Sequence, residues 1–348
     1  MIFYKHKPII GIDISKTSIK VVSADMTKML VHGYGSIELD PAKTTDDADD
    51  RADYLKERMN ELFRHHIVGK LDSNRAVVGI PTARTYARTF VLPADQEAKI
   101  TEAVNLEVEQ YVPMPLESLY VDHQILRRDK QGLTVLMCAV PRKAVDEVLA
   151  VAEACGVEVA MIEPSINSVA RLLDNTREGG LPTVIVDIGP ASTDIAIVDG
   201  GIRVTGGLNI GGNTLTLDIA KKLDIPLENA HQFKVLNGLS AGPRQKKLVA
   251  ALKPNLARIT GEVQKVMRYY TDRFPDERKI EQILIVGSGS NIPGIGEFFT
   301  NELVMAARVA SPWQSLNFGP LSPPAKQLRP RYMTAAGLAL VKTEEIWR

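Results

Sequence analysis

The sequence predicts an α/β fold of two similar lobes that face each other across a cleft, with a small α+β domain inserted into the first lobe. A strand–turn–strand pattern that occurs twice, half a chain length apart, is the main basis for this prediction. The length of 348 residues is too great for one simple core and suits two lobes. A Gly-rich turn after a buried strand near the C-terminus completes the pattern.

The composition is that of an ordinary globular protein, with 45% hydrophobic and 24% charged residues and a net charge of zero. A neutral chain lacks the broad positive field that non-specific nucleic-acid binding requires, so we expect no nucleic-acid partner. The chain has no run of about 20 apolar residues and no secretory signal, which indicates a cytoplasmic location. Cys138 and Cys155 lack metal-ligand spacing and are predicted to be free core thiols.

The first hairpin consists of a strand over Ile9–Ile14, a polar turn over 15–18 and a strand over 19–22. Such a turn can direct successive backbone N–H groups at phosphate oxygens, and its hydroxyls add further donors. The lysine in the turn adds a compact positive charge. We therefore predict that four turn residues bind phosphate: Ser15, Lys16, Thr17 and Ser18.

The second hairpin repeats the first, because Asp187-Ile188-Gly189 aligns with Asp13-Ile14-Ser15 and later positions also match. The predicted phosphate-binding residues of its turn are Gly189, Ser192 and Thr193. In both hairpins the first strand ends in an aspartate, and the bare carboxylates of Asp13 and Asp187 would repel each other across the cleft. A Mg²⁺ ion held between them through water would remove that repulsion.

For either hairpin alone, the simpler interpretation is an aspartate that caps a tight turn. The Gly-rich turn at 287–294 favours a nucleotide, because glycines let the backbone approach a ligand closely. That turn lies between a predicted strand, Gln282–Val286, and a predicted helix, Ile295–Leu303. By itself it is equally typical of an ordinary strand-to-helix connection. Beside two phosphate hairpins it is the expected third element, with four predicted contacts: Gly287, Gly289, Ser290 and Ile292.

Two other nucleotide motifs are excluded. The segment 11–17 is similar to a P-loop, but Ser15 replaces the glycine before the lysine, and a strand follows instead of a helix. In the Gly-rich turn at 287–294, Ile292 stands at the third glycine position of a Rossmann motif, and the turn lies near the chain end.

The remaining segments supply the body of the fold. The sequence predicts a helix over 52–66 and a strand over Arg75–Ile80 in the first lobe. The segment 227–274 is predicted to be helical with a break at Pro254. The segment 84–155 is predicted to form the inserted α+β unit, with strands over 88–92, 120–126 and 133–140 and helices over 95–112 and 142–155.

The order of these motifs resembles the actin-like (ribonuclease H-like) ATPase superfamily over nearly the whole chain. The two hairpins look like its phosphate loops and 287–294 like its adenosine loop, while Ile162-Glu163-Pro164 and 334–339 look like its connecting segments. The insertion at 84–155 occupies the position that it has in FtsA and PilM. The segment 106–117, an acidic helix followed by Gln-Tyr and a Pro-x-Pro-Leu turn, is similar to the PilM family of type IV pilus assembly proteins.

This resemblance implies that ATP and Mg²⁺ bind in the cleft, with Asp13 and Asp187 at the metal. It implies further nucleotide contacts from Gly212, Asn213 and Lys234, and a role for Glu163 in positioning the attacking water, with slow turnover or none. The sequence departs from relatives at His231, where many carry glutamate, and at Pro190, where many carry glycine.

The resemblance also implies partners. PilM-like proteins are cytoplasmic and hold the N-terminal cytoplasmic tail of the membrane protein PilN in a groove between the first lobe and the inserted domain. The surface around Leu106, Tyr111, Val112 and Met114 is a candidate for this contact, although Leu106 and Val112 are expected in the inserted domain's own core. The pilus motor ATPase, other platform proteins and self-association are further implied contacts, with the inner membrane reached through partners.

Two rival functions remain open on the sequence alone. One is an FtsA-like cell-division filament, which would need a membrane anchor that the sequence does not reveal. The other is a small-metabolite kinase of the same superfold, which would need a catalytic aspartate and a substrate pocket in the cleft.

The resemblance predicts four structural parts. The inserted α+β domain and the mostly helical subdomain are continuous, whereas both lobes are assembled from separate segments. These parts are the first lobe at 1–83, 156–178 and 330–348, the inserted domain at 84–155, the second lobe at 179–223 and 280–329, and the helical subdomain at 224–279.

Overall fold

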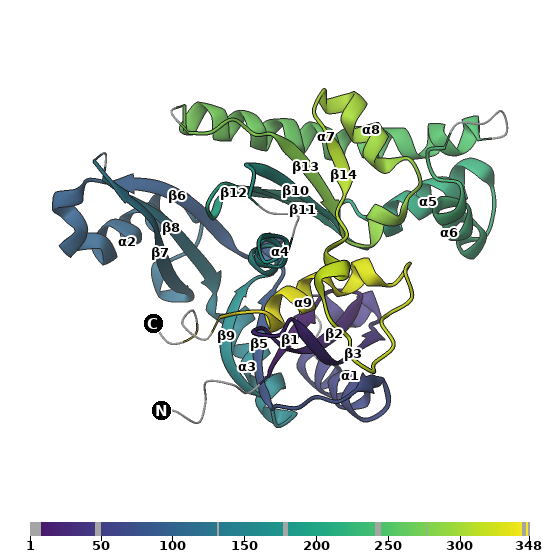
Figure 1. Cartoon of the computed structure of the whole chain (residues 1–348), viewed down its shortest axis with the longest axis horizontal. Coiled ribbons are helices and arrows are strands. Elements are labelled where there is room, and N and C mark those ends of the chain that lie inside the picture. Colours follow the sequence, from purple (N-terminus) through teal and green to yellow (C-terminus); the bar gives the residue numbers. More distant parts are fainter. Residues whose placement is uncertain are drawn as a thin grey trace.

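The computed structural model describes residues 8–45, 50–130, 132–176, 180–240, 245–275, 277–342 and 346. These residues form nine α-helices and three β-sheets (Figure 1). A six-stranded sheet has the order β4-β3-β2-β1-β5-β9, with strands β1 (Ile9–Ile14), β2 (Ser18–Asp25), β3 (Leu30–Glu38), β4 (Ile67–Gly69), β5 (Arg75–Ile80) and β9 (Glu158–Pro164).

The second large sheet has the order β12-β11-β10-β13-β14. Its strands are β10 (Thr183–Ile188), β11 (Thr193–Val198), β12 (Ile202–Leu208), β13 (Gln282–Val286) and β14 (Ala307–Val309). A third sheet, β6-β8-β7, belongs to the inserted unit and contains β6 (Tyr86–Leu92), β7 (Leu119–Asp129) and β8 (Gly132–Pro141).

The two larger sheets are built on one plan, which confirms the predicted duplication. β1 runs antiparallel to β2 and parallel to β5, and β10 likewise runs antiparallel to β11 and parallel to β13. Even the turns agree: the N–H of Ser15 donates to Ser18 O at 3.0 Å, and the N–H of Gly189 donates to Ser192 O at 2.9 Å. The repeat in the sequence is therefore a repeat of strand order, direction and turn geometry.

Helices α4 (Ser165–Asp174) and α9 (Met333–Ala339) lie between the two larger sheets (Figure 1). One apolar cluster joins strands of both sheets to these helices, so the lobes share a core at this point. Very close approaches fix the position of α9. A Cβ atom added at Gly11 would overlap the carbonyl oxygen of Ala335, and one added at Gly337 would overlap that of Ser168.

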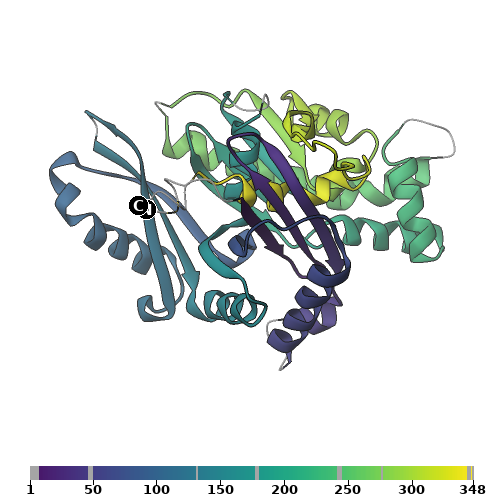
Figure 2. The ribbon, with the colours of Figure 1, turned by 60° about the horizontal axis from the view of Figure 1, so that its bottom comes forward.

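The other helices cover the outer faces of the sheets. Helices α1 (Arg51–His65) and α3 (Arg142–Ala154) pack on the first sheet, while α7 (Lys246–Arg273) and α8 (Ile295–Leu303) cover the second. Helices α5 (Gly212–Leu223) and α6 (Leu227–Leu236) lie at the end of the molecule opposite the inserted unit, as two views show (Figures 1 and 2). No described helix combines the length and the apolar character that spanning a bilayer requires.

The inserted unit packs α2 (Ile100–Tyr111) on its three-stranded sheet around its own core. It also contacts the second lobe. The guanidinium of Arg127 pairs with Glu277 at 2.8 Å, and the Thr89 hydroxyl donates to Ile202 O at 3.4 Å. The inserted unit is thus joined covalently to the first lobe and by side chains to the second.

Several sequence predictions need correction. Helix α7 runs through Pro254, and the interruption comes earlier, between Leu236 and Lys246. A proline inside a helix costs about 3 kcal/mol. The full burial of Leu252 and Leu256 on either side offsets this cost, since each such side chain contributes about 1.5–3 kcal/mol.

The exposed fraction of Leu106 corrects a further prediction, that this side chain belongs to the core of the inserted unit. Val112 is buried in the core of the inserted unit as expected, but Leu106 is 58% exposed and lies outside it. The predicted helix over 95–112 begins as a 3₁₀ turn, Ala94–Lys99, and becomes α-helical at Ile100. Both cysteines are free, as predicted.

The close packing of α9 can be tested by adding a methyl group at the glycines where backbone meets backbone. Gly11→Ala and Gly337→Ala each force a Cβ against a backbone carbonyl, so we expect each variant to lose about 1–3 kcal/mol of unfolding free energy. Gly261→Ala in α7 is the matched control, because a Cβ there meets nothing within 4 Å and should add about 0.5–1 kcal/mol. Urea denaturation measures all three. Equal stability of Gly337→Ala and Gly261→Ala would contradict the packing.

Candidate nucleotide-binding site

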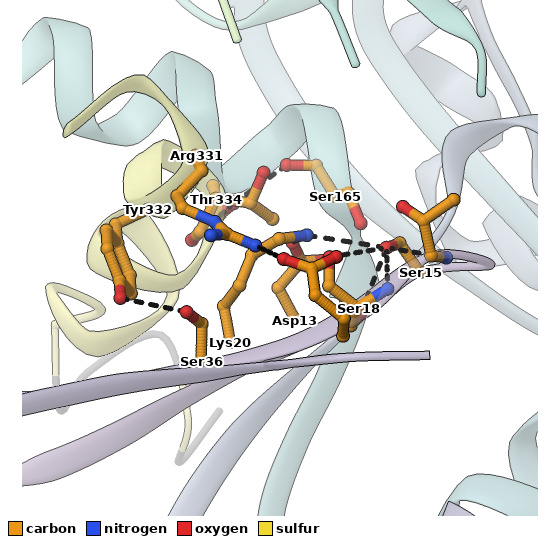
Figure 3. A network of polar contacts seen from close by, with 12 residues as sticks. Asp13, Ser15, Ser18, Lys20, Ser36, Ser165, Arg331, Tyr332 and Thr334 are labelled. Atoms are coloured by element: carbon orange, nitrogen blue, oxygen red, sulfur yellow. Dashed lines mark hydrogen bonds and ion pairs between the residues drawn. The ribbon is translucent and has the colours of Figure 1, made fainter. Parts of the chain in front are cut away.

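On the first-lobe side, the site is lined by an ion pair between Asp13 and Lys20, which was not predicted from the sequence. Asp13 on β1 lies directly opposite Lys20 on β2, and Lys20 Nζ donates to Asp13 Oδ2 at 2.7 Å and to Ser15 Oγ at 3.4 Å (Figure 3). Both charged residues are less than a tenth exposed. The signal was present in the hairpin register, since a two-strand pairing closed at 15–18 places residue 20 beside residue 13.

The first turn holds its own donors in place. The Ser15 hydroxyl oxygen accepts the N–H groups of Thr17 and Ser18 at 3.4 and 3.2 Å. These are long bonds to a neutral oxygen, so a phosphate oxygen would be a stronger acceptor for the same N–H groups. Lys16 is exposed at the tip, whereas Ser18 is only 1% exposed.

The second-lobe wall carries two carboxylates rather than one. Asp187 on β10 pairs in register with Asp194 on β11, so their side chains lie on the same face of the sheet. Burial, then the charges of Asp194 and Asp13, raise the pKa of Asp187 to about 7, against a smaller lowering by Lys20. Burial raises the pKa of Asp194 to about 6, with a lowering by a Thr82 hydrogen bond and a further rise from Asp13.

The two walls face each other, since Thr82 of the first lobe hydrogen-bonds Asp194 of the second and both line one pocket. The charge of Asp13 in the first lobe acts on both Asp187 and Asp194 in the second. Three carboxylates share this space with Lys20, which pairs directly with only one of them. Such uncompensated buried charge is the environment that a hard cation neutralises, so these residues fit Mg²⁺.

The described side chains do not by themselves form a complete metal shell. Within the described ranges, no three His, Cys, Asp or Glu residues are arranged to hold an ion. A Mg²⁺ ion here would take most of its ligands from water and phosphate oxygens, as is usual for this metal beside nucleotides.

The second turn packs against the start of α5. Gly189 O and Pro190 O accept the N–H groups of Gly212 and Asn213 at 2.9 and 2.8 Å. A Cβ atom at Gly211 would lie 2.5 Å from Gly189 O, so only glycine permits this approach. The predicted residues Gly189, Gly212 and Asn213 therefore lie together.

Lys234 on α6 joins the same group. Its Nζ donates to Gly212 O and to Thr216 Oγ1, both at 2.7 Å, and the residue is 5% exposed. Burial lowers the pKa of Lys234 to about 8. Burial, followed by the charge of Lys234, also lowers the pKa of the neighbouring His231.

The Gly-rich turn reaches the same edge of the sheet because β13 runs parallel to β10 and both strands end there. Gly287 has φ +76°, and a Cβ atom on it would overlap the carboxylate of Asp187. One on Gly289 would overlap the side chain of Ile188. The turn therefore sits against Asp187 with no side chain between them, and Ser290 beside it is 6% exposed.

Two predicted residues are not brought to the cleft by their side chains. Thr193 is fully buried and donates to Ile210 O at 2.7 Å, because strand alternation turns it away from the face that carries Asp194. Ile292 is 2% exposed within the apolar core of the second lobe, so only its backbone remains for a ligand.

Glu163 lies in register with Gly79 and Asp13 on the first sheet and is held in an ion pair. Both of its carboxylate oxygens accept from Arg171, at 2.6 and 2.7 Å, and Arg171 also donates to Gly337 O at 3.1 Å. This bidentate pair ties β9 to α4 and α9, which gives Glu163 a structural explanation. Its role in positioning water stays a prediction.

The carboxylate cluster predicts a pH dependence. The raised pKa of Asp187 means that its stabilising contribution is full below its ordinary pKa of 3.8 and is lost as pH rises through about 7. Because asparagine does not ionise, Asp187→Asn removes this pH-dependent loss of stability. Without added nucleotide, we expect the variant to gain on the order of 1–3 kcal/mol over the wild type between pH 5.5 and pH 8.5.

Thermal unfolding across this pH range measures the effect. Asp95→Asn, at an exposed position, is the control and should track the wild type. A constant difference between Asp187→Asn and the wild type from pH 5.5 to 8.5 would show that Asp187 is not under electrostatic stress.

Comparisons with known proteins agree with the two-lobed fold. In a solved PilM-PilN type IV pilus biogenesis complex, the similar chain is 21% identical, with a TM-score of 0.78 over 95% of this chain and 97% of that one. MreB5 of Spiroplasma citri bound to ADP is 13% identical, with a TM-score of 0.56 over 98% of this chain and 97% of that one. These likenesses show that the fold is the actin-like α/β fold.

Sequence comparison gives the family. The cell division protein FtsA of Neisseria meningitidis serogroup B is 26% identical over 310 residues, which cover 80% of this chain and 70% of that protein. The profile of the family described as type IV pilus assembly protein PilM matches residues 11–343. Because this match spans almost the whole sequence, the chain belongs to the PilM family of type IV pilus assembly proteins.

Proposed function

We propose that this protein is a nucleotide-controlled adaptor of the type IV pilus assembly platform. ATP and Mg²⁺ occupy the cleft between the lobes, and the chain holds the cytoplasmic N-terminal tail of a PilN-like membrane protein. The observation that carries the proposal is the family match over residues 11–343. The protein would act in the cytoplasm and reach the inner membrane, the pilus motor and other platform proteins through such contacts.

The carboxylate cluster supports the nucleotide part of the proposal. Asp13 and Asp187 would hold Mg²⁺ through water, with Asp194 beside them, and the bound metal would supply the charge that neutralises both carboxylates and phosphates. Lys16, Lys20 and the turn N–H groups would contact phosphate oxygens from both lobes. A neighbour of the same fold, MreB5, is described as bound to ADP.

The remaining site residues would serve the nucleoside end. Lys234 holds the start of α5 against the second hairpin, and the turn at 287–292 packs against the same hairpin at Asp187 and Ile188. Glu163 is engaged by Arg171 on both oxygens, and a water-positioning role would require this pair to open. We therefore expect binding and lobe closure, with slow hydrolysis or none, to be the function of the site.

A narrow pocket supports a tail site between the first lobe and the inserted unit. It measures about 20 Å³ and lies where α1, α3 and β5 meet, with Leu55, Ile80 and Val148 among its apolar walls. The ion pair of Arg51 and Glu147, at 2.9 Å, borders it. An apolar seam with a charged border suits an amphipathic peptide, which would widen the seam on binding.

Self-association is a second candidate behaviour, favoured by the 26% identity to FtsA. An FtsA-like filament would sediment in the presence of ATP and Mg²⁺, whereas an adaptor would stay in the supernatant. Sedimentation at increasing protein concentration, with and without nucleotide, separates the two.

Nucleotide binding is tested by thermal shift. ATP–Mg²⁺ at a hundredfold excess over Kd should stabilise the wild type by about 2.7 kcal/mol. Asp13→Asn should lose most of this gain, because it removes one carboxylate facing the metal, while the control Asp95→Asn keeps it. A wild type that ATP–Mg²⁺ does not stabilise would remove the nucleotide from the proposal.

Tail binding is tested with a synthetic peptide of the PilN-like protein's cytoplasmic tail, labelled for fluorescence anisotropy. Val148→Arg places a charge in the seam pocket and should weaken binding about tenfold or more. Leu149→Arg, at the next position of α3, is 39% exposed, does not line the pocket and should bind normally. Equal weakening by both variants, or by neither, would refute this placement of the groove.

A further inference from the structure

A pocket of about 540 Å³ lies between the inserted unit and the second lobe, apart from the seam pocket described above. Its walls are consecutive residues of β6 and β12 together with one face of α7, which includes Lys265 and Tyr269. Its inner end reaches Asp194 and Thr82 at the cleft. The volume falls within the range of about 300–1,000 Å³ typical of ligand sites.

Two free strand edges border this pocket. β6 is the outer strand of the three-stranded sheet and β12 is the outer strand of the five-stranded sheet, and they lie next to each other (Figure 1). A side-chain bond from Thr89 to Ile202 O, at 3.4 Å, connects them, but in the described part of the chain no backbone–backbone hydrogen bond does. Residues 86–89 of one edge and 203–208 of the other line the pocket.

Arginine donors without acceptors also border it. Arg203 is 5% exposed and its Nε donates to Asp199 O at 2.9 Å, but its NH1 group has no hydrogen-bond partner among the described residues. The nearest carboxylate oxygen paired with Arg203 belongs to Glu277, at 3.9 Å from the other amino group. A buried guanidinium N–H without an acceptor is costly, so the site favours an incoming acceptor oxygen.

Arg88 stands on the opposite wall. Its guanidinium stacks on the Tyr111 ring at 3.1 Å from the centroid, and its Nε lies 3.4 Å from Glu107 without a hydrogen bond. Tyr86 and Tyr269 add aromatic surface to the same pocket. The walls thus offer strand backbone, aromatic rings and guanidinium groups together.

We propose that this pocket is a strand-addition site for an extended peptide segment of a partner protein that carries a carboxylate side chain. The peptide lies in the pocket and pairs its backbone with the free edge of β12, while β6 forms the opposite wall. Backbone pairing gives affinity, and alternate side chains give specificity. Its carboxylate accepts from Arg88 and Arg203.

An extended peptide is the occupant that matches these walls. An extended peptide presents backbone donors and acceptors at regular intervals along its length, as the free edge of β12 does. Paired strands of this kind lie about 4.8 Å apart. A compact small molecule would satisfy only a few of these groups. The site shares no lining residue with the seam pocket, although Tyr111 and Val112, which the sequence predicts at the tail contact, line it. The tail peptide is therefore kept in excess in the experiment, so that an enriched peptide is one that binds beside it.

The experiment uses a phage-displayed library of random linear twelve-residue peptides, selected on the intact chain with ATP–Mg²⁺ and a saturating excess of the PilN-like tail peptide. An enriched peptide is then synthesised, and its Kd is measured by calorimetry. We expect Arg88→Ala and Tyr269→Ala to weaken it about tenfold or more. Tyr120→Ala is the matched control, since Tyr120 is 40% exposed and Tyr269 is 44% exposed. Tyr120 lies on β7, outside the pocket.

Two further measurements test the strand mode itself. N-methylation of the peptide at successive residues should abolish binding at alternate positions only, because alternate N–H groups of a strand face one edge. Amide hydrogen exchange should slow in β12 on binding. Failure to enrich any peptide, equal Kd values for wild type and Tyr269→Ala, or indifference to N-methylation would each overturn the proposal.

Discussion

The mutual repulsion of the carboxylates that face each other between the lobes is the constraint on which the rest of the structure depends. Asp13 projects from one lobe, and Asp187 and Asp194 project from the other, into the space between the lobes. Lys20 pairs directly with only the first of them. Each carboxylate raises the free energy of its neighbours, so added positive charge or protons favour the arrangement in which they face each other. A metal-bound nucleotide would therefore act on the angle between the lobes through this cluster.

The scaffold makes that cluster possible by bringing two copies of one sheet close together. Helices α4 and α9 lie between them, and glycine at 11 and 337 lets backbone touch backbone where any side chain would intervene. The apolar cluster around these helices contains residues of both lobes. The lobes thus share one packed junction, and the charged walls lie beside it. Motion between lobes would have to occur as rotation about this junction, since packed cores resist compression.

The inserted unit contacts both lobes, so a rotation between them would also change its surface. It is covalently part of the first lobe, yet Arg127 holds Glu277 of the second lobe, and Leu126 packs against Gly201. A change in lobe angle must break these contacts or carry the inserted unit along. Both proposed peptide sites border this unit, one on each side. A partner that prefers one lobe arrangement would therefore be coupled to the nucleotide, and by linkage the coupling would act in both directions.

The sequence by itself determined the local units and their repetition. Strand pattern and turn chemistry predicted the observed bounds of β5, β13 and α8, and the repeated Asp-x-[Ser/Gly] turns implied two facing aspartates. Tertiary structure decided which side chains share a face. Register placed Lys20 beside Asp13 and Asp194 beside Asp187, while alternation turned Thr193 away. Packing also kept α7 intact through its proline and left Leu106 exposed, because burial energy depends on neighbours that are distant in sequence.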